Sequence, residues 1–168
     1  MSAALVTTEI ASPVGPLLVG ANDEGVCMLE FSDCDRASQT AAANGVAKNG
    51  AHLFLEQLRG ELADYFAGRL TEFRVPLSID GTEWQRKVWG ELRRIPHGQT
   101  RSYQDVARAV CSAKAARAVG MANGQNRIAI VIPCHRVINA GGKLGGYGGG
   151  LWRKEFLLAL ERGQEPPA

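Results

Sequence analysis

The chain changes character at Asp80-Gly81-Thr82, and this change limits what it can fold into. Upstream, short β-like runs are separated by turn-forming residues, whereas downstream short helices dominate. A chain of 168 residues is long enough for one large domain or two small ones. The sequence therefore predicts an α+β protein, with a small α/β domain over residues 1–80 and a second, mainly helical domain over residues 81–168.

The first half has the pattern of an antiparallel meander followed by one helix. Apolar residues recur at helical spacing over His52–Ala67. Residues 33–50 have no clear period and predict a mobile loop, and Pro76 places the run Phe73–Ile79 at the edge of a sheet. The other predicted strands are Thr7–Ala11, Leu17–Ala21 and Gly25–Phe31.

The second half has the pattern of a helix-turn-helix. Thr82 and Ser102 stand at N-cap positions, and the helices that follow them stop before Pro96 and at Val110. A tight turn leads from the second of these helices into a third. The elements predicted after this turn are a helix Ala115–Asn123, a strand 128–132, a glycine-rich loop 141–150 and a helix Trp152–Glu161.

The two halves of the chain differ in net charge as well as in predicted secondary structure. Residues 1–80 carry five Lys and Arg against eleven Asp and Glu, a net charge of −6. Residues 81–168 carry fourteen against six, a net charge of +8. A basic domain is typical of proteins that bind polyanions such as nucleic acids. A gradient of solvated charges is the alternative.

The run Ile130-Val-Ile-Pro-Cys-His-Arg-Val-Ile138 carries the most chemical information. Pro133 ends an apolar stretch, so Cys134 is expected on a turn at the end of a strand. The thiolate is the nucleophilic form of cysteine, and a neighbouring His and Arg would raise the thiolate fraction. Adjacent side chains of an extended chain point to opposite faces, so His135 reaches the sulfur only through a turn or a bridging water. A buried structural cysteine beside a surface histidine is the alternative.

The helix predicted over residues 115–123 is nearly bare, because Ala and Gly occupy most of its positions. Such a helix can approach a large partner closely, for example the floor of a DNA groove, with Arg117 filling a gap in the base stack. Tight packing against another helix is the alternative.

Several classes of protein are disfavoured by the sequence. The N-terminus has no basic flank and no long apolar stretch, so we expect neither a signal peptide nor a membrane span. The cysteines form no Cys-x-x-Cys pair, and the three histidines show no metal-ligand spacing. We therefore expect a cytoplasmic protein with reduced thiols and with no metal or cofactor.

Six ordered blocks between about Gly81 and Glu161 resemble the O6-alkylguanine-DNA alkyltransferases, the methylated-DNA–protein-cysteine methyltransferases. The blocks are Ser102-Tyr103, Arg117-Ala-Val-Gly, Asn126, Pro133-Cys-His-Arg-Val, Gly146-Tyr-Gly-Gly-Gly and Lys154-Glu-Phe-Leu-Leu-Ala-Leu-Glu161. The first half resembles the family's variable N-terminal domain through Ser12-Pro-Val-Gly-Pro-Leu and Tyr65-Phe-Ala-Gly. The resemblance implies a ribonuclease-H-like N-terminal domain and a winged-helix-like C-terminal domain that contains the helix-turn-helix.

The resemblance also implies the reaction and its catalytic residues. Cys134 would accept a methyl or other alkyl group from O6 of guanine, and from O4 of thymine, once per molecule and irreversibly. His135 would take the thiol proton through a water, Glu161 would hold His135, and Asn126 would orient the thiol. Without the resemblance, Glu161 would be interpreted as a solvated carboxylate and Asn126 as a turn former.

The implied guanine pocket combines side chains with backbone groups. Tyr103 would donate to N3, Tyr147 would wall the pocket, and the backbone N–H of Gly148 would donate to O6. The carbonyls of Cys134 and Val137 would accept from the N2 amine. A half-buried helix residue is the alternative for Tyr103.

The implied DNA partner is a duplex that contains O6-alkylguanine, bound by a monomer, with cooperative binding left open. Arg117 would fill the place of the flipped base. Arg136 would anchor the active-site turn or contact a phosphate, and Lys154 would shape the pocket or be a solvated lysine. The other implied DNA-binding residues are Ser102, Ala116, Ala118 and Gly120.

The chain departs from the family pattern at two positions of the site. Gly148 stands where the family often has Ser or Ala, and Arg127 stands where proline is frequent.

Two other classes of protein remain as alternatives. A winged-helix protein that binds alkylguanine without reacting would need an inert Cys134. A Cys-His hydrolase would need an oxyanion hole and would turn over acyl substrates.

Overall fold

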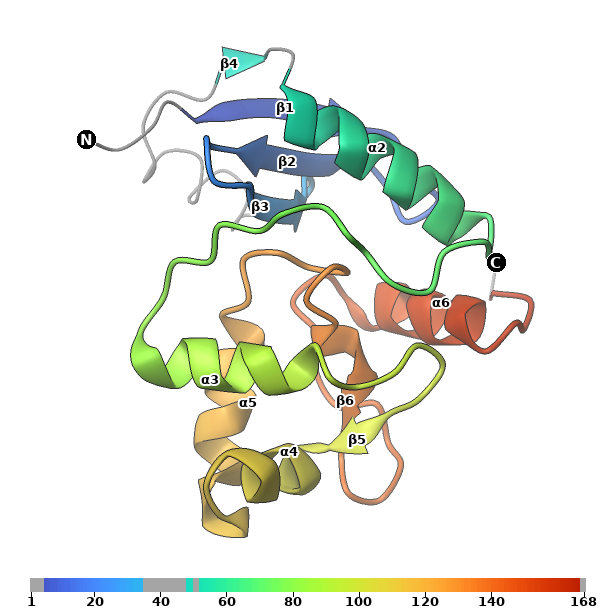
Figure 1. The fold of residues 1–168 in the computed structure, drawn as a ribbon. Helices are drawn as coiled ribbons and strands as arrows, with labels where there is room; N and C mark the ends of the chain where they lie inside the picture. Colours follow the sequence, from blue (N-terminus) through green and yellow to red (C-terminus); the bar gives the residue numbers. More distant parts are fainter. Residues whose placement is uncertain (1–4, 35–47, 50–51, 167–168) are drawn as a thin grey trace. The chain divides into compact units, whose positions relative to one another are not determined.

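The computed structural model describes residues 5–34, 48–49 and 52–166. The chain forms two compact units, Met1–Ile79 and Asp80–Ala168, which we call unit 1 and unit 2. Their boundary lies one residue before the one predicted from the sequence. With a four-stranded sheet and a helix in unit 1 and a mainly helical unit 2, the α+β fold class is confirmed (Figure 1).

In the part of unit 1 that the structure describes, helix α2 (Leu53–Phe66) covers a four-stranded sheet (Figure 1). The sheet has the order β3-β2-β1-β4, in which β1, β2 and β3 are antiparallel neighbours and β4 lies parallel to β1. Helix α2 starts where the Nδ1 atom of His52 accepts a hydrogen bond from the backbone N–H of Phe54 (3.1 Å). The elements are β1 (Val6–Ile10), β2 (Leu17–Ala21), β3 (Val26–Phe31), β4 (Lys48–Asn49) and α2 (Leu53–Phe66).

Two sequence-based predictions for unit 1 need correction. The run Phe73–Ile79 is not a strand and contributes only an isolated bridge between Leu77 and Val26. The backbone of Pro76 lies very close to Gly25. A Cβ atom added to Gly25 would be 2.4 Å from the carbonyl oxygen of Pro76. Most of the loop predicted over residues 33–50 lies outside the described residues, but its last part contains strand β4.

Unit 2 is built from short helices and a pair of short strands (Figure 1). Thr82 and Ser102 are N-caps as predicted, and each forms a reciprocal capping box with the residue three positions later. Strands β5 and β6 pair in parallel. The elements are α3 (Glu83–Leu92), β5 (Arg101–Ser102), α4 (Tyr103–Val110), η1 (Ala113–Ala115), α5 (Ala116–Gly124), η2 (Cys134–Arg136), β6 (Val137–Ile138) and α6 (Leu151–Glu161).

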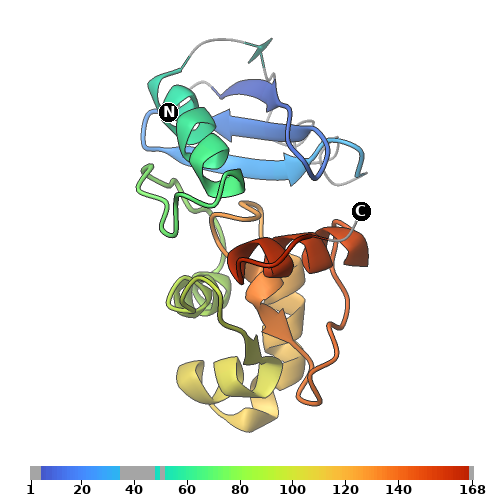
Figure 2. The same cartoon turned by 90° about the vertical axis from the view of Figure 1, so that its right-hand side faces the viewer.

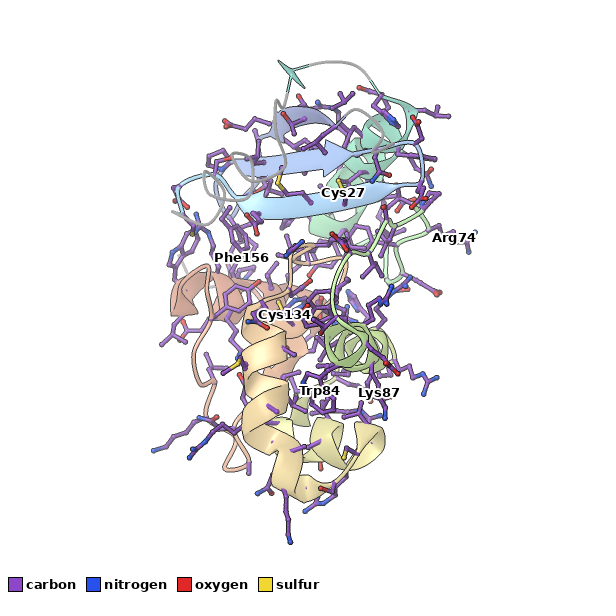
Figure 3. All side chains as sticks on the ribbon, turned by 90° about the vertical axis from the view of Figure 1, so that its left-hand side faces the viewer. Cys27, Arg74, Trp84, Lys87, Cys134 and Phe156 are labelled. Atoms are coloured by element: carbon purple, nitrogen blue, oxygen red, sulfur yellow. The ribbon has the colours of Figure 1, made fainter. Side chains whose placement is uncertain are left out.

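Helices α4 and α5 form the predicted helix-turn-helix, and α3 packs against both. The indole N–H groups of Trp84 and Trp89 donate to the carbonyls of Ala118 (3.3 Å) and Ala122 (2.9 Å). Figure 3 shows Trp84 beside α5. The small residues of α5 therefore allow close helix packing on this side, which was one of the two interpretations of the bare helix.

The segment before Cys134 is a turn instead of the strand predicted over residues 128–132. The backbone N–H of Ile132 donates to the carbonyl of Ile128 (3.0 Å), and Ile130 has a φ of 70°. The apolar run therefore reflects burial and not strand pairing, which a sequence pattern alone does not distinguish. Helix α6 packs against the η2 turn that follows (Figure 2).

No helix in the described part of the chain is long and apolar enough to cross a membrane.

Candidate active site

Cys134 lies at the start of the η2 turn and is buried, with 7% of its surface exposed. Its backbone N–H donates to the carbonyl of Ile132 (2.8 Å), and its own carbonyl accepts a hydrogen bond from the side-chain amide of Asn123 (3.4 Å). The turn expected after Pro133 is therefore present, although the strand before it is not. Figure 3 shows Cys134 within unit 2.

The thiol of Cys134 is buried, and three polar or charged side chains act on it. Burial raises the pKa of Cys134, while hydrogen bonds with Asn126 and Tyr147 and the positive charge of Lys154 lower it. The net result is a pKa above the ordinary value, so the resting group is a thiol at neutral pH. The side chains that favour the thiolate are those of Asn126, Tyr147 and Lys154. The sequence had predicted that Arg136 would do so.

Asn126 connects the thiol to the turn that precedes it. Its amide nitrogen donates to the carbonyl of Ile132 (2.8 Å), and its amide oxygen accepts from the backbone N–H of Ile128 (3.0 Å). Because Asn126 is buried and also hydrogen-bonds to Cys134, it couples the shape of the turn to the position of the sulfur.

His135, Arg136 and Glu161 form a buried charged cluster behind the thiol. The Nε2 atom of His135 lies 2.7 Å from Oε2 of Glu161. Arg136 donates to both oxygens of the same carboxylate, at 2.8 Å from Nε and 3.0 Å from Nη2. Burial alone would raise the pKa of Glu161, but the charges and hydrogen bonds of the other two residues hold it well below its usual range.

The ionised Glu161 decides which nitrogen of His135 carries a proton. A carboxylate only accepts hydrogen bonds, so in the neutral imidazole the proton is on Nε2 and the lone pair is on Nδ1. The Nδ1 atom is buried and accepts no hydrogen bond from the residues described in the structure. The residue that follows Cys134 in the η2 turn therefore has a nitrogen lone pair with which to accept a proton.

Arg136 is a structural part of this cluster. The side chain is buried, and its Nη1 atom donates to the carbonyl of Ile95 (2.7 Å) in addition to its two bonds with Glu161. Its guanidinium is committed to interior partners, which favours the anchoring role over the phosphate contact that was also considered.

Lys154 is fully buried, so the solvated alternative considered for it does not hold. Its ammonium group donates to the carbonyls of Val137 (2.7 Å), Gly146 (3.3 Å) and Leu144. Burial lowers the pKa of Lys154 to about 8, and the neighbouring Cys134 opposes this shift. The lysine therefore ties β6 to the glycine-rich loop.

The two carbonyls implied to bind the guanine amine, those of Cys134 and Val137, each hold one side-chain donor. The Cys134 carbonyl also accepts a hydrogen bond from the backbone N–H of Val137, so both of its lone pairs have partners in this structure. The donors, Asn123 and Lys154, fix the direction in which these carbonyls point.

Two tyrosines lie within electrostatic reach of the sulfur. Burial and then the nearby Cys134 raise the pKa of Tyr103, which is half-buried at the start of α4. Burial, followed by the same cysteine, raises the pKa of Tyr147 well above its usual value. Gly148 is exposed, and a Cβ atom there would meet nothing within 4 Å. The structure thus brings both predicted aromatic pocket residues to the nucleophile.

Four of the residues predicted to contact DNA lie on α5, whereas Ser102 caps α4 and Arg136 lies in η2. Arg117 is exposed, and Ala118 is exposed although its carbonyl faces Trp84. Gly120 faces the ring of Tyr103, where an added Cβ atom would be 3.8 Å away. The remaining members are Ala116, partly exposed at the start of α5, and Ser102, the N-cap of α4.

Sequence reasoning missed two residues that hold this site, Asn123 and Arg153. Asn123 is four positions after buried Val119 on α5, so helical spacing would have placed it on the inner face. Arg153 is 3% exposed and donates from Nη1 to the carbonyl of Gly149 (2.9 Å). No pattern in the sequence separates this arginine from a solvated one at the start of a helix.

The described residues contain no group of three or more His, Cys, Asp or Glu side chains that could hold a metal ion.

Comparison with known proteins covers nearly the whole chain. Residues 5–79 match the ribonuclease-like domain of 6-O-methylguanine DNA methyltransferase, and residues 83–163 match the DNA binding domain of the same family. A methylated-DNA–protein-cysteine methyltransferase of Mycolicibacterium paratuberculosis is 50% identical over 159 residues, which are 94% of this chain and 92% of that protein. One from Methanosarcina acetivorans is 44% identical over 150 residues, which are 89% of this chain and 94% of the other.

Solved structures give the same result. The crystal structure of Mycobacterium tuberculosis OGT in complex with DNA is 42% identical, with a TM-score of 0.85, and the match covers 96% of this chain and 94% of that one. The crystal structure of Mycobacterium tuberculosis O6-methylguanine methyltransferase has the same identity and TM-score, with 98% and 97% covered.

Proposed function

Since the chain belongs to the 6-O-methylguanine DNA methyltransferase family, we propose that Cys134 is the residue to which it transfers the alkyl group of methylated DNA. The observation that carries this assignment is the buried thiol of Cys134, which hydrogen-bonds with Asn126 and Tyr147 and directly precedes His135, the partner of Glu161, in the same turn. The protein is a single-use transferase that repairs the base directly.

The reaction follows from the chemistry of sulfur and of the leaving base. The proton of Cys134 moves to Nδ1 of His135 through a water, and the sulfur attacks the carbon attached to O6. The S–C bond forms as the C–O6 bond breaks, and the bonding electron pair leaves with the base. A proton returns to the guanine, so the thiol proton is in effect exchanged for the alkyl group. The product is a thioether, which has no electrophilic carbonyl for water to attack, so each chain reacts once.

Glu161 and Arg136 make the proton transfer favourable. A carboxylate fixed on Nε2 stabilises the imidazolium that forms when Nδ1 takes the proton. Arg136 keeps that carboxylate ionised and in place with two hydrogen bonds. This support matters because the resting Cys134 is a thiol and not a thiolate.

The substrate is a duplex whose damaged guanine is flipped out of the stack. Flipping costs a few kcal/mol, which contacts of the protein must offset. Arg117 is exposed on α5 and is available to fill the vacancy. Tyr103 donates to N3 of the base, Tyr147 forms a wall of the pocket, and the backbone N–H of Gly148 donates to O6. Alkylated O4 of thymine is a second substrate of the same chemistry.

The surface charge of unit 2 supports binding to DNA phosphates. Three of its fourteen Lys and Arg and one of its six Asp and Glu are buried, which leaves eleven basic against five acidic groups at the surface. The exposed groups therefore carry a net charge of +6. The residues that face the groove of the DNA are Ser102, Ala116, Ala118 and Gly120.

The protein acts as a monomer. None of its four cysteines forms a disulfide, which fits a cytoplasmic location.

Intact-mass measurement after mixing with a duplex that contains O6-methylguanine tests the function. We expect one added methyl group per chain, located on Cys134 by peptide mapping, with no further uptake when more DNA is added. A protein that binds the damaged base without reacting would keep its mass. A Cys-His hydrolase would turn over an acyl substrate and hold no lasting adduct.

A further inference from the structure

The first turn of α6 places two cations in the protein interior. Arg153 is 3% exposed and Lys154 is fully buried. The N-terminal end of a helix is the positive end of its dipole, where cations are unfavourable. Burying a charge is also costly unless hydrogen bonds compensate for it. The position of these side chains therefore needs a specific set of partners.

Apart from the carbonyl of Val137, their carbonyl partners lie in the loop formed by residues 141–150. Arg153 donates to the carbonyl of Gly149 (2.9 Å), and Lys154 donates to those of Leu144 and Gly146. Seven of the ten loop residues are glycine, and glycine loses more conformational freedom on ordering than any other residue. A loop of this composition depends on its contacts for a fixed shape.

Tyr147 lies between the two stretches of loop that these cations hold. Its hydroxyl group is close enough to the sulfur of Cys134 to lower the pKa of the thiol, and its carbonyl accepts from the backbone N–H of Gly150 (2.9 Å). An alkyl group that arrives on the sulfur must occupy space next to this ring. The position of Tyr147 therefore limits the size of the group that can be transferred.

The guanidinium of Arg153 is itself held in place. Its Cζ atom lies 4.7 Å from the centre of the Trp152 ring, a cation–π contact. Its positive charge also opposes the burial that raises the pKa of Tyr147, so the guanidinium and the phenol are within electrostatic reach of each other.

We propose that Arg153 is a positioning residue that fixes the width of the alkyl pocket by holding the Gly149 carbonyl and, through it, Tyr147. The inference rests on the proposed role of Cys134 as the alkyl acceptor. Arg153 touches the loop and not the reacting atoms, so it acts on which groups fit and not on how the thiol is activated.

The test compares two alkyl groups on the same DNA. Single-turnover rates are measured with matched duplexes that contain O6-methylguanine or O6-benzylguanine, so that the cost of base flipping cancels in the ratio. Arg153→Met keeps a flexible, unbranched side chain but is shorter and cannot donate a hydrogen bond. Methyl transfer should slow about tenfold, as expected for a slightly misplaced pocket wall. Benzyl transfer should slow less, so the benzyl-to-methyl ratio rises.

Two further variants make the result decisive. Arg153→Lys keeps the charge and one donor, and should restore part of the wild-type ratio. Arg162→Met removes an exposed arginine just beyond the end of the same helix and should leave both rates unchanged. Melting curves show which variants fold. If Arg153→Met does not fold, the benzyl-to-methyl ratio of Arg153→Lys tests the inference.

An unchanged benzyl-to-methyl ratio in the folded Arg153 variants would overturn the inference, including the case in which both rates fall equally. A wild-type chain that takes up no alkyl group would instead overturn the proposed function. The mass spectrum of the wild-type sample separates these two failures.

Discussion

The two units bury very different kinds of side chain. Among the described residues, unit 1 buries two polar or charged side chains, Thr7 and Glu30, whereas unit 2 buries seven. Those of unit 2 are Asn123, Asn126, His135, Arg136, Arg153, Lys154 and Glu161. A buried polar group costs free energy unless it is satisfied, so such a concentration is typical of a site that performs chemistry. Unit 1 has the interior of a scaffold and unit 2 has the interior of an active site.

Cysteine substitution gives the largest expected contrast between the units. Cys134→Ser should abolish alkyl transfer and preserve DNA binding, because a hydroxyl of similar size is a much weaker nucleophile. Cys27 is the matched control, since it is a half-buried cysteine of unit 1 whose pKa is also raised by burial. Cys27→Ser should react at the wild-type rate. Repair by the Cys134 variant at a comparable rate, measured by intact mass in a single turnover, would remove the distinction.

The charged cluster of unit 2 should show the next largest effect. Glu161→Gln should slow alkylation by about 10²–10⁴-fold, the usual contribution of general acid–base help. It should also destabilise unit 2 by about 3 kcal/mol, because Arg136 is left as a buried cation without its counter-charge. All three tryptophans lie in unit 2, so tryptophan fluorescence reports on that unit alone.

Glu91→Gln is the control for this experiment, since Glu91 pairs with the exposed Arg94 at the surface of the same unit. Its effect on stability should stay within about 0.5 kcal/mol. If the Glu161 and Glu91 variants behaved alike, the buried cluster would have no special role.

Arg117 should separate DNA binding from chemistry within unit 2. Arg117→Ala should slow the reaction with duplex O6-methylguanine at least about tenfold, because the duplex must be unstacked at a cost of a few kcal/mol. The reaction with free O6-benzylguanine should be nearly unchanged, since the free base needs no flipping. Arg117→Lys should be intermediate, because it keeps the charge without the planar group. Equal losses on both substrates would assign Arg117 to the fold of unit 2.

Acid should weaken unit 2 through Glu161, by less than the substitution does. The folded pKa of Glu161 lies below its unfolded value, so its ionisation stabilises the fold above about pH 4.3. That stabilisation is lost as the pH falls further. Asp105 adds a contribution of the same sign through its N-cap hydrogen bonds. Melting temperature followed by tryptophan fluorescence should drop in this range for the wild type, and less steeply for Glu161→Gln.

The sequence was most informative where local rules decide the structure. The N-caps Thr82 and Ser102 and the turn at Cys134 follow from the preferences of single residues, and they are present in the structure. The runs 73–79 and 128–132 were wrongly predicted as strands, because β-branched, apolar residues also occur in irregular segments and, as in 128–132, in buried turns. Pairing partners that are distant in sequence decide between these outcomes, and a local pattern does not contain them.

The chemistry of the site was only partly accessible from the sequence. The resemblance to the family supplied the roles of Cys134, His135 and Glu161. The structure added that Arg136 is committed to Glu161, that Lys154 is buried, and that Arg153 holds the loop. Lysine and arginine are mostly found at surfaces. Their burial therefore had to be seen in three dimensions, because it depends on which carbonyls the fold brings to them.

The positive φ of Ile130 has a consequence for the order in which the protein folds. A buried, β-branched residue in this conformation costs on the order of 1–3 kcal/mol, and the surrounding structure must hold it there. The turn that precedes Cys134 is therefore stable only after the surrounding segments have folded. We expect Cys134 to become reactive late in folding. In a refolding experiment with free O6-benzylguanine, alkylation should lag behind the recovery of tryptophan fluorescence, and simultaneous recovery would contradict this. A chain that is still folding carries an ordinary cysteine, and reactivity towards the damaged base marks a chain that has finished.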